Sequence, residues 1–182
     1  MNELSQNLKQ LDIDANINKE TFVSQVEKLV KDAGYTTVEL NDQKPWGAYI
    51  RFDGGEADRF VAEFFPGLTS TEARLGVEDA ELSPKILIVA PGQRLSWQYH
   101  NRRAERWAFL TEGAYNKSDT DDEGEAIRAN PGDVVQFARS ERHRLVGLDN
   151  TYVLVAEIWQ HSDTDAMSDE DDIVRLADDY KR

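Results

Sequence analysis

The pattern of hydrophobic and polar positions divides the chain into a helical beginning and a strand-rich remainder. Residues 1–17 are polar with weak periodicity, which indicates a short or loose helical lead-in. Within residues 18–34, Val23, Val26 and Val30 recur at helical spacing on one face, with an asparagine and a glycine placed to cap the two ends. This segment is therefore predicted to be an amphipathic helix that covers a core.

From residue 85 onward the pattern changes to short apolar or alternating runs separated by Pro-Gly, Asp-rich and Gly breaks. Seven such runs are expected to be strands, at residues 85–90, 93–100, 106–115, 125–129, 133–138, 143–148 and 151–160. Short strands at this spacing predict an antiparallel sandwich or barrel. The fold class is therefore expected to be all-β.

The remaining segments are expected to decorate this barrel. We predict an N-terminal helical extension over residues 1–40 and a barrel domain over 41–182. Residues 54–84 look like an unusual surface insertion, in which 58–65 fits either a strand or a short helix. The C-terminal tail is acidic, and residues 172–180 are predicted to form a short helix.

Composition and charge narrow the class of protein. The chain has 182 residues, 40% of them hydrophobic, which is enough for a sizeable core in one domain. Its net charge of −14 would repel phosphate backbones, so nucleic acid and anionic membranes are not expected partners. There are no cysteines, which excludes disulfides and thiolate zinc sites. No signal peptide or transmembrane run is seen, so a cytoplasmic location is expected.

Residues 95–107, "LSWQYHNRRAERW", carry the candidate chemistry. Gln98 and His100 are two positions apart, so their side chains point to the same side of a strand. Glu105 follows after a short polar stretch, which leaves room for a turn and a return strand. One amide, one imidazole and one carboxylate can thus converge on a point, as a metal ion requires, with a further ligand from elsewhere. Ser96 has the same strand parity and is expected to face the same cavity.

The stretches 91–113 and 130–150 together resemble the two sequence motifs of the cupin superfamily. The first motif is met by Gly92, Gln98, His100 and Glu105, with Gln98 in place of a histidine and Gly113 one position late. In the second motif Gly132 and His143 are present, while Ala138, Ser140 and Gly147 replace its Pro, Gly and Asn. With "KPWGAY" upstream and "EDDIVRLADDYKR" at the end, the chain resembles the cupin domain of type II phosphomannose isomerases. Ala177 and Lys181 depart from that family's tail pattern.

The resemblance implies a cupin β-barrel with one divalent metal ion, held by Gln98, His100, Glu105 and His143. It implies a metal-dependent aldose–ketose isomerase, similar to mannose-6-phosphate isomerase, that converts a small-molecule sugar or sugar phosphate through a cis-enediolate. Zinc is the expected ion, and iron, manganese, cobalt or nickel would also suit these ligands. An oxygenase-type cupin and a non-catalytic sugar-binding cupin remain alternatives. A homodimer is permitted by the strand edges but is not required.

The residues that contact substrate are less well defined. By resemblance Arg144 is the catalytic or phosphate-facing arginine, although strict alternation after a ligand would point it away from the metal. Lys85 opens a strand and is expected to meet a sugar phosphate or to lie in solvent, and Ser96 is expected to hydrogen-bond substrate. Glu157, at a strand end, is a candidate general base. His161, in a polar segment, is expected to be exposed.

Overall fold

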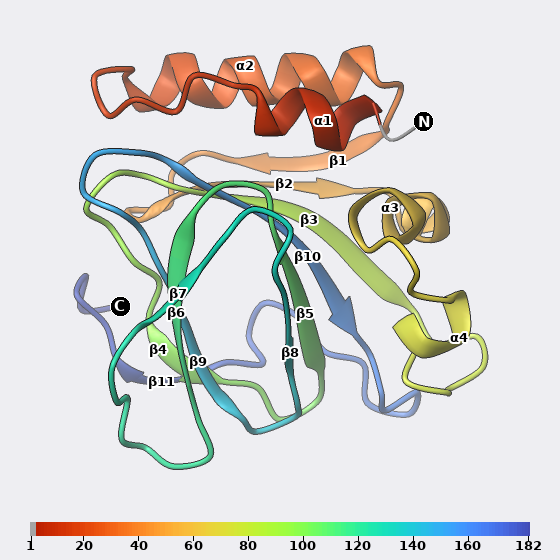
Figure 1. Ribbon diagram of the computed structural model, residues 1–182. Helices are drawn as coiled ribbons and strands as arrows, with labels where there is room; N and C mark the ends of the chain where they lie inside the picture. The colour runs from red at the N-terminus through yellow and green to blue at the C-terminus, as the bar shows by residue number, and fades with distance from the viewer. Residues whose placement is uncertain (1–2) are drawn as a thin grey trace.

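The computed structural model describes residues 3–182, which form two antiparallel sheets with helices layered on one side (Figure 1). The helical elements are α1 (Glu3–Lys9), α2 (Lys19–Asp32), the 3-10 turn η1 (Gly54–Glu56), α3 (Ala57–Phe64) and α4 (Ser70–Ala73). The strands are β1 (Thr37–Asn41), β2 (Gly47–Phe52), β3 (Leu82–Val89), β4 (Trp97–Tyr99), β5 (Ala104–Phe109), β6 (Gly113–Ser118), β7 (Ile127–Ala129), β8 (Val134–Phe137), β9 (Arg142–Val146), β10 (Val153–Gln160) and β11 (Val174–Ala177). None of the described helices is long and apolar enough to cross a membrane.

The two sheets enclose an apolar core between them. The six-stranded sheet has the order β1-β2-β3-β10-β5-β8, and the five-stranded sheet has the order β11-β4-β9-β6-β7. Strands of both sheets contribute buried side chains to one cluster, among them Leu87, Trp107, Phe109, Leu145 and Val155. The predicted antiparallel barrel is therefore confirmed.

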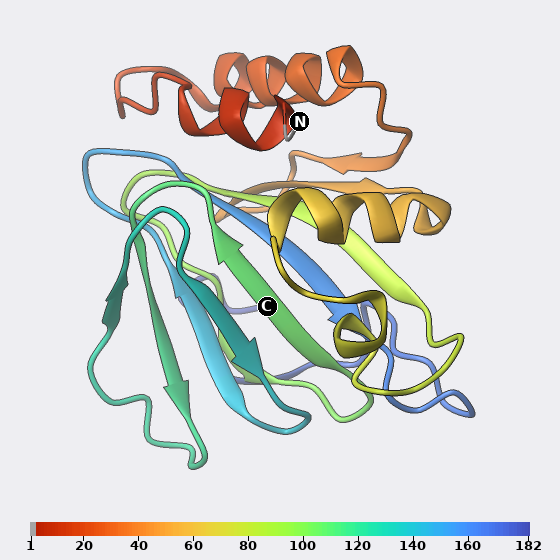
Figure 2. The same ribbon diagram turned by 45° about the vertical axis from the view of Figure 1, so that its right-hand side comes forward.

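The helices pack on the outer face of the six-stranded sheet, as both views show (Figures 1 and 2). The apolar stripe of α2 is buried there, including Val23, Val26 and Val30. Asn18 caps this helix by accepting a hydrogen bond from the backbone N–H of Thr21. The amphipathic pattern thus corresponds to a helix that covers the back of the barrel and leaves its interior free.

Strand β10 shows how the site is positioned. Its residues alternate between the two sides of the sheet, so Val155 lies in the interior core while Ala156 and Ile158 lie under the helices. The same alternation turns Glu157 and Trp159 toward the interior, where both line a cavity. A central strand that is buried on both faces therefore carries a carboxylate into the barrel.

Two predicted elements are wrong. The run 106–115 is not one strand: residues 110–112 bend, and the chain crosses from β5 in one sheet to β6 in the other. The predicted tail helix over 172–180 is instead strand β11, which pairs antiparallel with β4. The edge of β4 offers backbone hydrogen-bonding partners, and pairing with this edge outweighs the weak helical spacing of the tail.

The insertion at residues 54–84 is partly helical. The ambiguous segment 58–65 is the helix α3, which packs on the outer face of the six-stranded sheet. It is followed by the short helix α4, which begins with a capping box between Thr69 and Glu72. Strand β1 spans the expected boundary at residue 40 and pairs with β2.

Candidate metal centre

Three buried side chains from different strands converge inside the barrel. His100 directly follows β4, Glu105 lies on β5 and His143 lies on β9. One ligand atom from each lies within 4.8 Å of the others. His100 Nε2 is 3.0 Å from Glu105 Oε1, and His143 Nε2 is 3.3 Å from Glu105 Oε2. Two imidazoles and one carboxylate are a ligand set that fits a divalent transition metal.

The backbone fixes which nitrogen of each histidine faces the centre. His100 Nδ1 lies 2.6 Å from the carbonyl oxygen of Asp172, and His143 Nδ1 lies 2.9 Å from that of Glu141. Because a carbonyl only accepts, each Nδ1 carries the proton and each Nε2 carries a lone pair. The Nε2 of His143 is buried without a hydrogen-bond partner among the described residues. Such an orphaned lone pair, oriented by a backbone carbonyl, fits a metal ligand.

Gln98 lies beside this group on β4, opposite His143 in the strand pairing. Its amide oxygen accepts a hydrogen bond from the Ser96 hydroxyl, and its amide nitrogen is 3.4 Å from His100 Nε2. Rotating the amide by half a turn would present its oxygen to the centre instead, and amide orientation follows the hydrogen-bond network around it. Gln98 as the fourth ligand therefore stays a prediction.

Electrostatics favour the ligating forms of His100 and Glu105. Burial lowers the pKa of His100, which favours the neutral imidazole. Burial alone would raise the pKa of Glu105, but its neighbours, among them the charged Arg103 guanidinium, hold it well below its usual range. Arg103 Nε donates to Glu105 Oε1 at 2.9 Å while its guanidinium stacks on the Trp159 ring. The centre thus combines an ionised carboxylate with uncharged imidazole.

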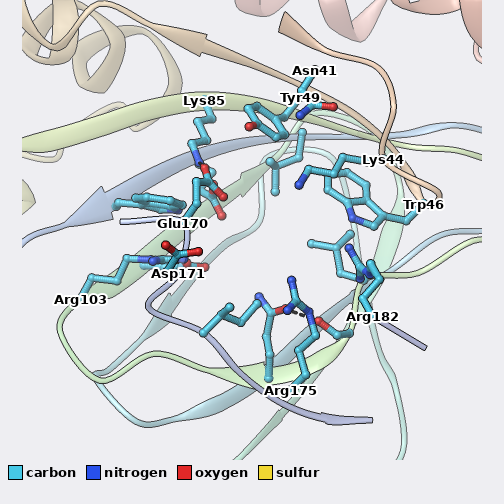
Figure 3. A pocket seen from close by; sticks show the side chains of 18 residues that line it. Asn41, Lys44, Trp46, Tyr49, Lys85, Arg103, Glu170, Asp171, Arg175 and Arg182 are labelled. Carbon is cyan, nitrogen blue, oxygen red and sulfur yellow. Dashed lines mark hydrogen bonds and ion pairs between the residues drawn. The ribbon is translucent and has the colours of Figure 1, made fainter. Parts of the chain in front are cut away.

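The centre opens into a cavity of about 560 Å³ (Figure 3). Gln98, Glu105 and Ser96 line its inner end. Its basic lining residues are Lys44, Lys85, Arg103, Arg175 and Arg182. Neither the Lys44 ammonium nor the Arg175 guanidinium has an ion-pair partner among the described residues. Four acidic residues, Glu105, Glu157, Glu170 and Asp171, line the same cavity. Basic residues are thus slightly in excess here, although the chain as a whole has a net charge of −14.

Lys85 and Glu170 meet at one side of this cavity, as Figure 3 shows. Lys85 Nζ donates to Glu170 Oε1 at 2.8 Å and lies 3.4 Å from the centre of the Trp159 ring. The Lys85 side chain is 3% exposed, whereas that of Glu170 is 54% exposed. The cavity thus contains a fixed cation, the Lys85 ammonium, and its anionic partner Glu170 is half exposed.

Glu157 is a second buried carboxyl in the cavity. In the sheet it lies between Lys85 on β3 and Trp107 on β5, and its Oε1 accepts a hydrogen bond of 3.0 Å from the Trp107 indole. Burial and the charge of Glu105 raise the pKa of Glu157 to about 8, against the opposing effect of Lys85. It is therefore a carboxyl poised to exchange protons near neutral pH.

Comparison with known proteins identifies the family. The family described as mannose-6-phosphate isomerase C-terminal matches residues 77–178, more than half of the chain. The chain belongs to this family. No curated protein sequence matches significantly.

Three solved structures illustrate what the chain is similar to. The capsular polysaccharide assembling protein CapF from Staphylococcus aureus is 18% identical, with 87% of this chain and 37% of that chain covered, at a TM-score of 0.50. A cupin 2 conserved barrel domain protein from Salinispora arenicola is 21% identical over 46% of this chain and 65% of its own, at 0.39. An Acidithiobacillus ferrooxidans protein provisionally described as a sugar phosphate isomerase is 18% identical over 43% and 49%, at 0.38. The chain thus covers less than two thirds of the length of each of these proteins.

In this member of the mannose-6-phosphate isomerase C-terminal family, Arg144 lies away from the candidate centre and His161 is not exposed. Arg144 is buried on the opposite side of β9 from His143, where it contacts Glu123 Oε1 at 2.8 Å and the carbonyl oxygen of Ala177 at 3.1 Å. It does not line the cavity, because neighbouring residues on a strand face opposite sides. His161, expected to be exposed, is 3% exposed because the chain after β10 folds back over it.

Some residues that support the centre were not predicted. Arg103 lies two positions before Glu105, and only the tertiary fold brings its guanidinium to the Glu105 carboxylate. Asp172 contacts His100 across 72 positions of sequence. The signal in the sequence that the tail supports the centre is the match of "EDDIVR" to the tail pattern of the phosphomannose isomerase family.

Proposed function

We propose that the protein is a metal-dependent aldose–ketose isomerase that acts on a sugar phosphate, with mannose 6-phosphate as the first candidate. The observation that carries this proposal is the joining of a buried ligand group, His100, Glu105 and His143, to a cavity rich in basic side chains. Membership of the mannose-6-phosphate isomerase C-terminal family supports it. A cavity of about 560 Å³ is also in the range of small-molecule sites.

The centre would hold one divalent ion through His100, Glu105 and His143, with Gln98 as a fourth ligand and zinc as the first candidate. When bound, the ion would polarise the sugar carbonyl and its neighbouring hydroxyl, which would lower the cost of removing the proton from the carbon that carries this hydroxyl. The protein's own part is to orient both imidazoles through backbone carbonyls.

The basic side chains would bind the phosphate. Lys85 is fixed by two aromatic rings, and Lys44 and Arg175 face the same cavity without ion-pair partners among the described residues. Local cations are needed here because the overall charge of the chain repels a phosphate dianion. The same cavity therefore provides a reason for a phosphorylated substrate over a free sugar.

Glu157 would move the proton. Both oxygens of Glu105 face the histidines, Lys85 is held by Glu170, and Ser96 donates to Gln98, so these groups are engaged. The Glu157 carboxylate would take the proton from C2 of the aldose, which leaves the cis-enediolate. The resulting carboxylic acid would return the proton to C1, and the C2 hydroxyl proton would pass through solvent to the C1 oxygen. C2 then carries the ketose carbonyl and C1 a hydroxyl, so no oxidant or reductant is consumed.

The test is exchange and isomerisation in deuterated water, with metal-loaded protein and either mannose 6-phosphate or free mannose. We expect deuterium at the carbon that receives the proton, together with ketose product, for the phosphorylated sugar. His143→Ala should abolish both, whereas Glu112→Gln, an exposed residue paired with Arg128, should behave as wild type.

Glu157→Gln should lower kcat by about 10²- to 10⁴-fold while the metal content stays unchanged. No exchange and no product with either sugar, despite one bound ion per chain, would contradict the isomerase proposal. Oxygen uptake by the iron-loaded protein would favour an oxygenase-type cupin instead. Tight sugar binding without turnover would favour a non-catalytic sugar-binding protein.

A further inference from the structure

The C-terminal segment 167–173 contacts the candidate metal centre directly. The carbonyl oxygen of Asp172 lies 2.6 Å from His100 Nδ1, and this contact is what presents Nε2 of the same ring to the centre. The backbone of the tail therefore sets the orientation of a metal ligand that lies 72 positions earlier in the sequence.

The Asp172 carboxylate fixes the turn that follows the same histidine. Its side chain is 3% exposed and accepts hydrogen bonds from the backbone N–H groups of Asn101 at 2.9 Å and Arg102 at 3.0 Å. A third bond comes from the Ser168 hydroxyl at 2.6 Å. One residue thus holds both the ring of His100 and the two residues after it.

Further buried contacts dock this part of the tail onto the barrel. Arg103 donates to the Ser168 hydroxyl at 2.8 Å and to the Asp169 carbonyl at 3.0 Å, while the same guanidinium bonds Glu105. The backbone N–H of Ser168 donates to His161 Nδ1 at 3.2 Å. The tail and two of the metal ligands therefore share one hydrogen-bond network.

We propose that Asp172 is a positioning residue that couples docking of segment 167–173 to the affinity of the centre for its ion. If docking orients His100, the docked tail raises metal affinity, and by reciprocity the bound ion stabilises the docked tail. The inference rests on the metal centre of the proposed function and not on the isomerase reaction.

The first experiment measures zinc affinity of the full chain by competition with a chromophoric chelator. Asp172→Ala keeps the backbone carbonyl that contacts His100 but removes the side-chain bonds that hold it in place. It should weaken zinc binding by about 10- to 100-fold, the range typical for mutation of residues that orient a ligating histidine. Asp172→Asn keeps one acceptor oxygen and should lose less. Asp179→Asn, in the same tail but paired with exposed Arg94, should stay within about threefold of wild type.

The second experiment measures amide hydrogen exchange of the wild-type protein with and without zinc. Zinc should slow exchange at Asn101, Arg102 and Ser168, whose N–H groups donate into the network. In Asp172→Ala this zinc-dependent protection should disappear. If that variant does not fold, Ser168→Ala, which removes one donor to Asp172, should weaken zinc binding by about 3- to 10-fold.

Distinct results would overturn the two proposals. The coupling alone would be overturned if wild type binds zinc and Asp172→Ala binds it with the same affinity. It would also be overturned if Asp179→Asn weakens zinc binding as much as Asp172→Ala does. Amide hydrogen exchange in the tail that zinc does not slow would overturn it as well. A wild-type chain that binds no divalent ion would overturn the metal centre, and the coupling with it. A purely structural Asp172 would change stability and leave zinc affinity as it is.

Discussion

Protonation of His161 is expected to destabilise the protein as the solution becomes acidic. His161 Nδ1 accepts the Ser168 N–H at 3.2 Å, so its proton lies on Nε2, which is 2.9 Å from the Ser83 hydroxyl. Burial, together with the positive charges of Arg103 and Lys85, lowers its pKa from 6.5 to about 4, and Asp172 opposes this only weakly. A proton on Nδ1 would also face the Ser168 N–H and break this anchor of the tail.

The sign and size of the effect follow from the two pKa values. The unfolded chain takes up a proton on this imidazole near pH 6.5, whereas the folded protein resists until about pH 4. Stability is therefore complete above pH 6.5 and is lost as the pH falls from there toward 4. At about 1.4 kcal/mol per pKa unit, the loss is about 2 kcal/mol at pH 5 and approaches about 3 kcal/mol at pH 4.

Urea unfolding of wild type and His161→Gln at pH 7.5 and pH 5, in the presence of a chelator, would measure this. Carboxylates with lowered pKa, such as Asp172 and Asp178, destabilise both proteins in acid, so only the difference belongs to His161. Wild type should lose about 2 kcal/mol more than the variant over this interval. Parallel loss in the two proteins would refute the reasoning.

Three other changes test separate features. Glu170→Gln frees Lys85 from a half-exposed ion pair worth about 0.5–1 kcal/mol. The KM for a sugar phosphate should therefore fall about 2- to 5-fold, while the KM for the free sugar stays unchanged. A higher KM for the sugar phosphate would contradict a phosphate-binding role of Lys85. Gly47→Ala should prevent folding in a solubility assay, because Gly47 has φ 154° and a Cβ there would lie 1.9 Å from the Ile88 carbonyl oxygen; a soluble variant of normal Tm would contradict this. Arg144→Met should lower Tm with kcat within about threefold of wild type, and a larger fall in kcat would return the residue to the active site.

Much of the fold could be predicted because its signals are local. Helix α2 follows from one apolar face with a polar cap, and most barrel strands follow from alternation between turn residues. The errors arise where tertiary pairing decides. Residues 174–177 form a strand because β4 has a free edge, and the bend at 110–112 depends on which sheet receives the next strand.

The same distinction applies to the site. His100 and Glu105 could be assigned because they lie in one short motif, and His143 because a second motif contains it. Asp172 acts through its backbone carbonyl, which no residue type marks, and it reaches the centre only once the tail has docked. Arg144 is the opposite case. The resemblance suggested that it faces the substrate, whereas strand alternation already indicated that its side chain points away from the metal centre, as it does in the structure.

The tail places two acidic residues with opposite tasks two positions apart. Asp172 is buried and holds the turn after His100, so moving it would disturb the ligand. Glu170 is half exposed and holds only the Lys85 ammonium, so it can leave at small cost. An incoming anion can therefore replace Glu170 at Lys85 while the segment stays anchored at Asp172. Lys85 can thus exchange its anionic partner while the candidate metal ligand His100 keeps its orientation.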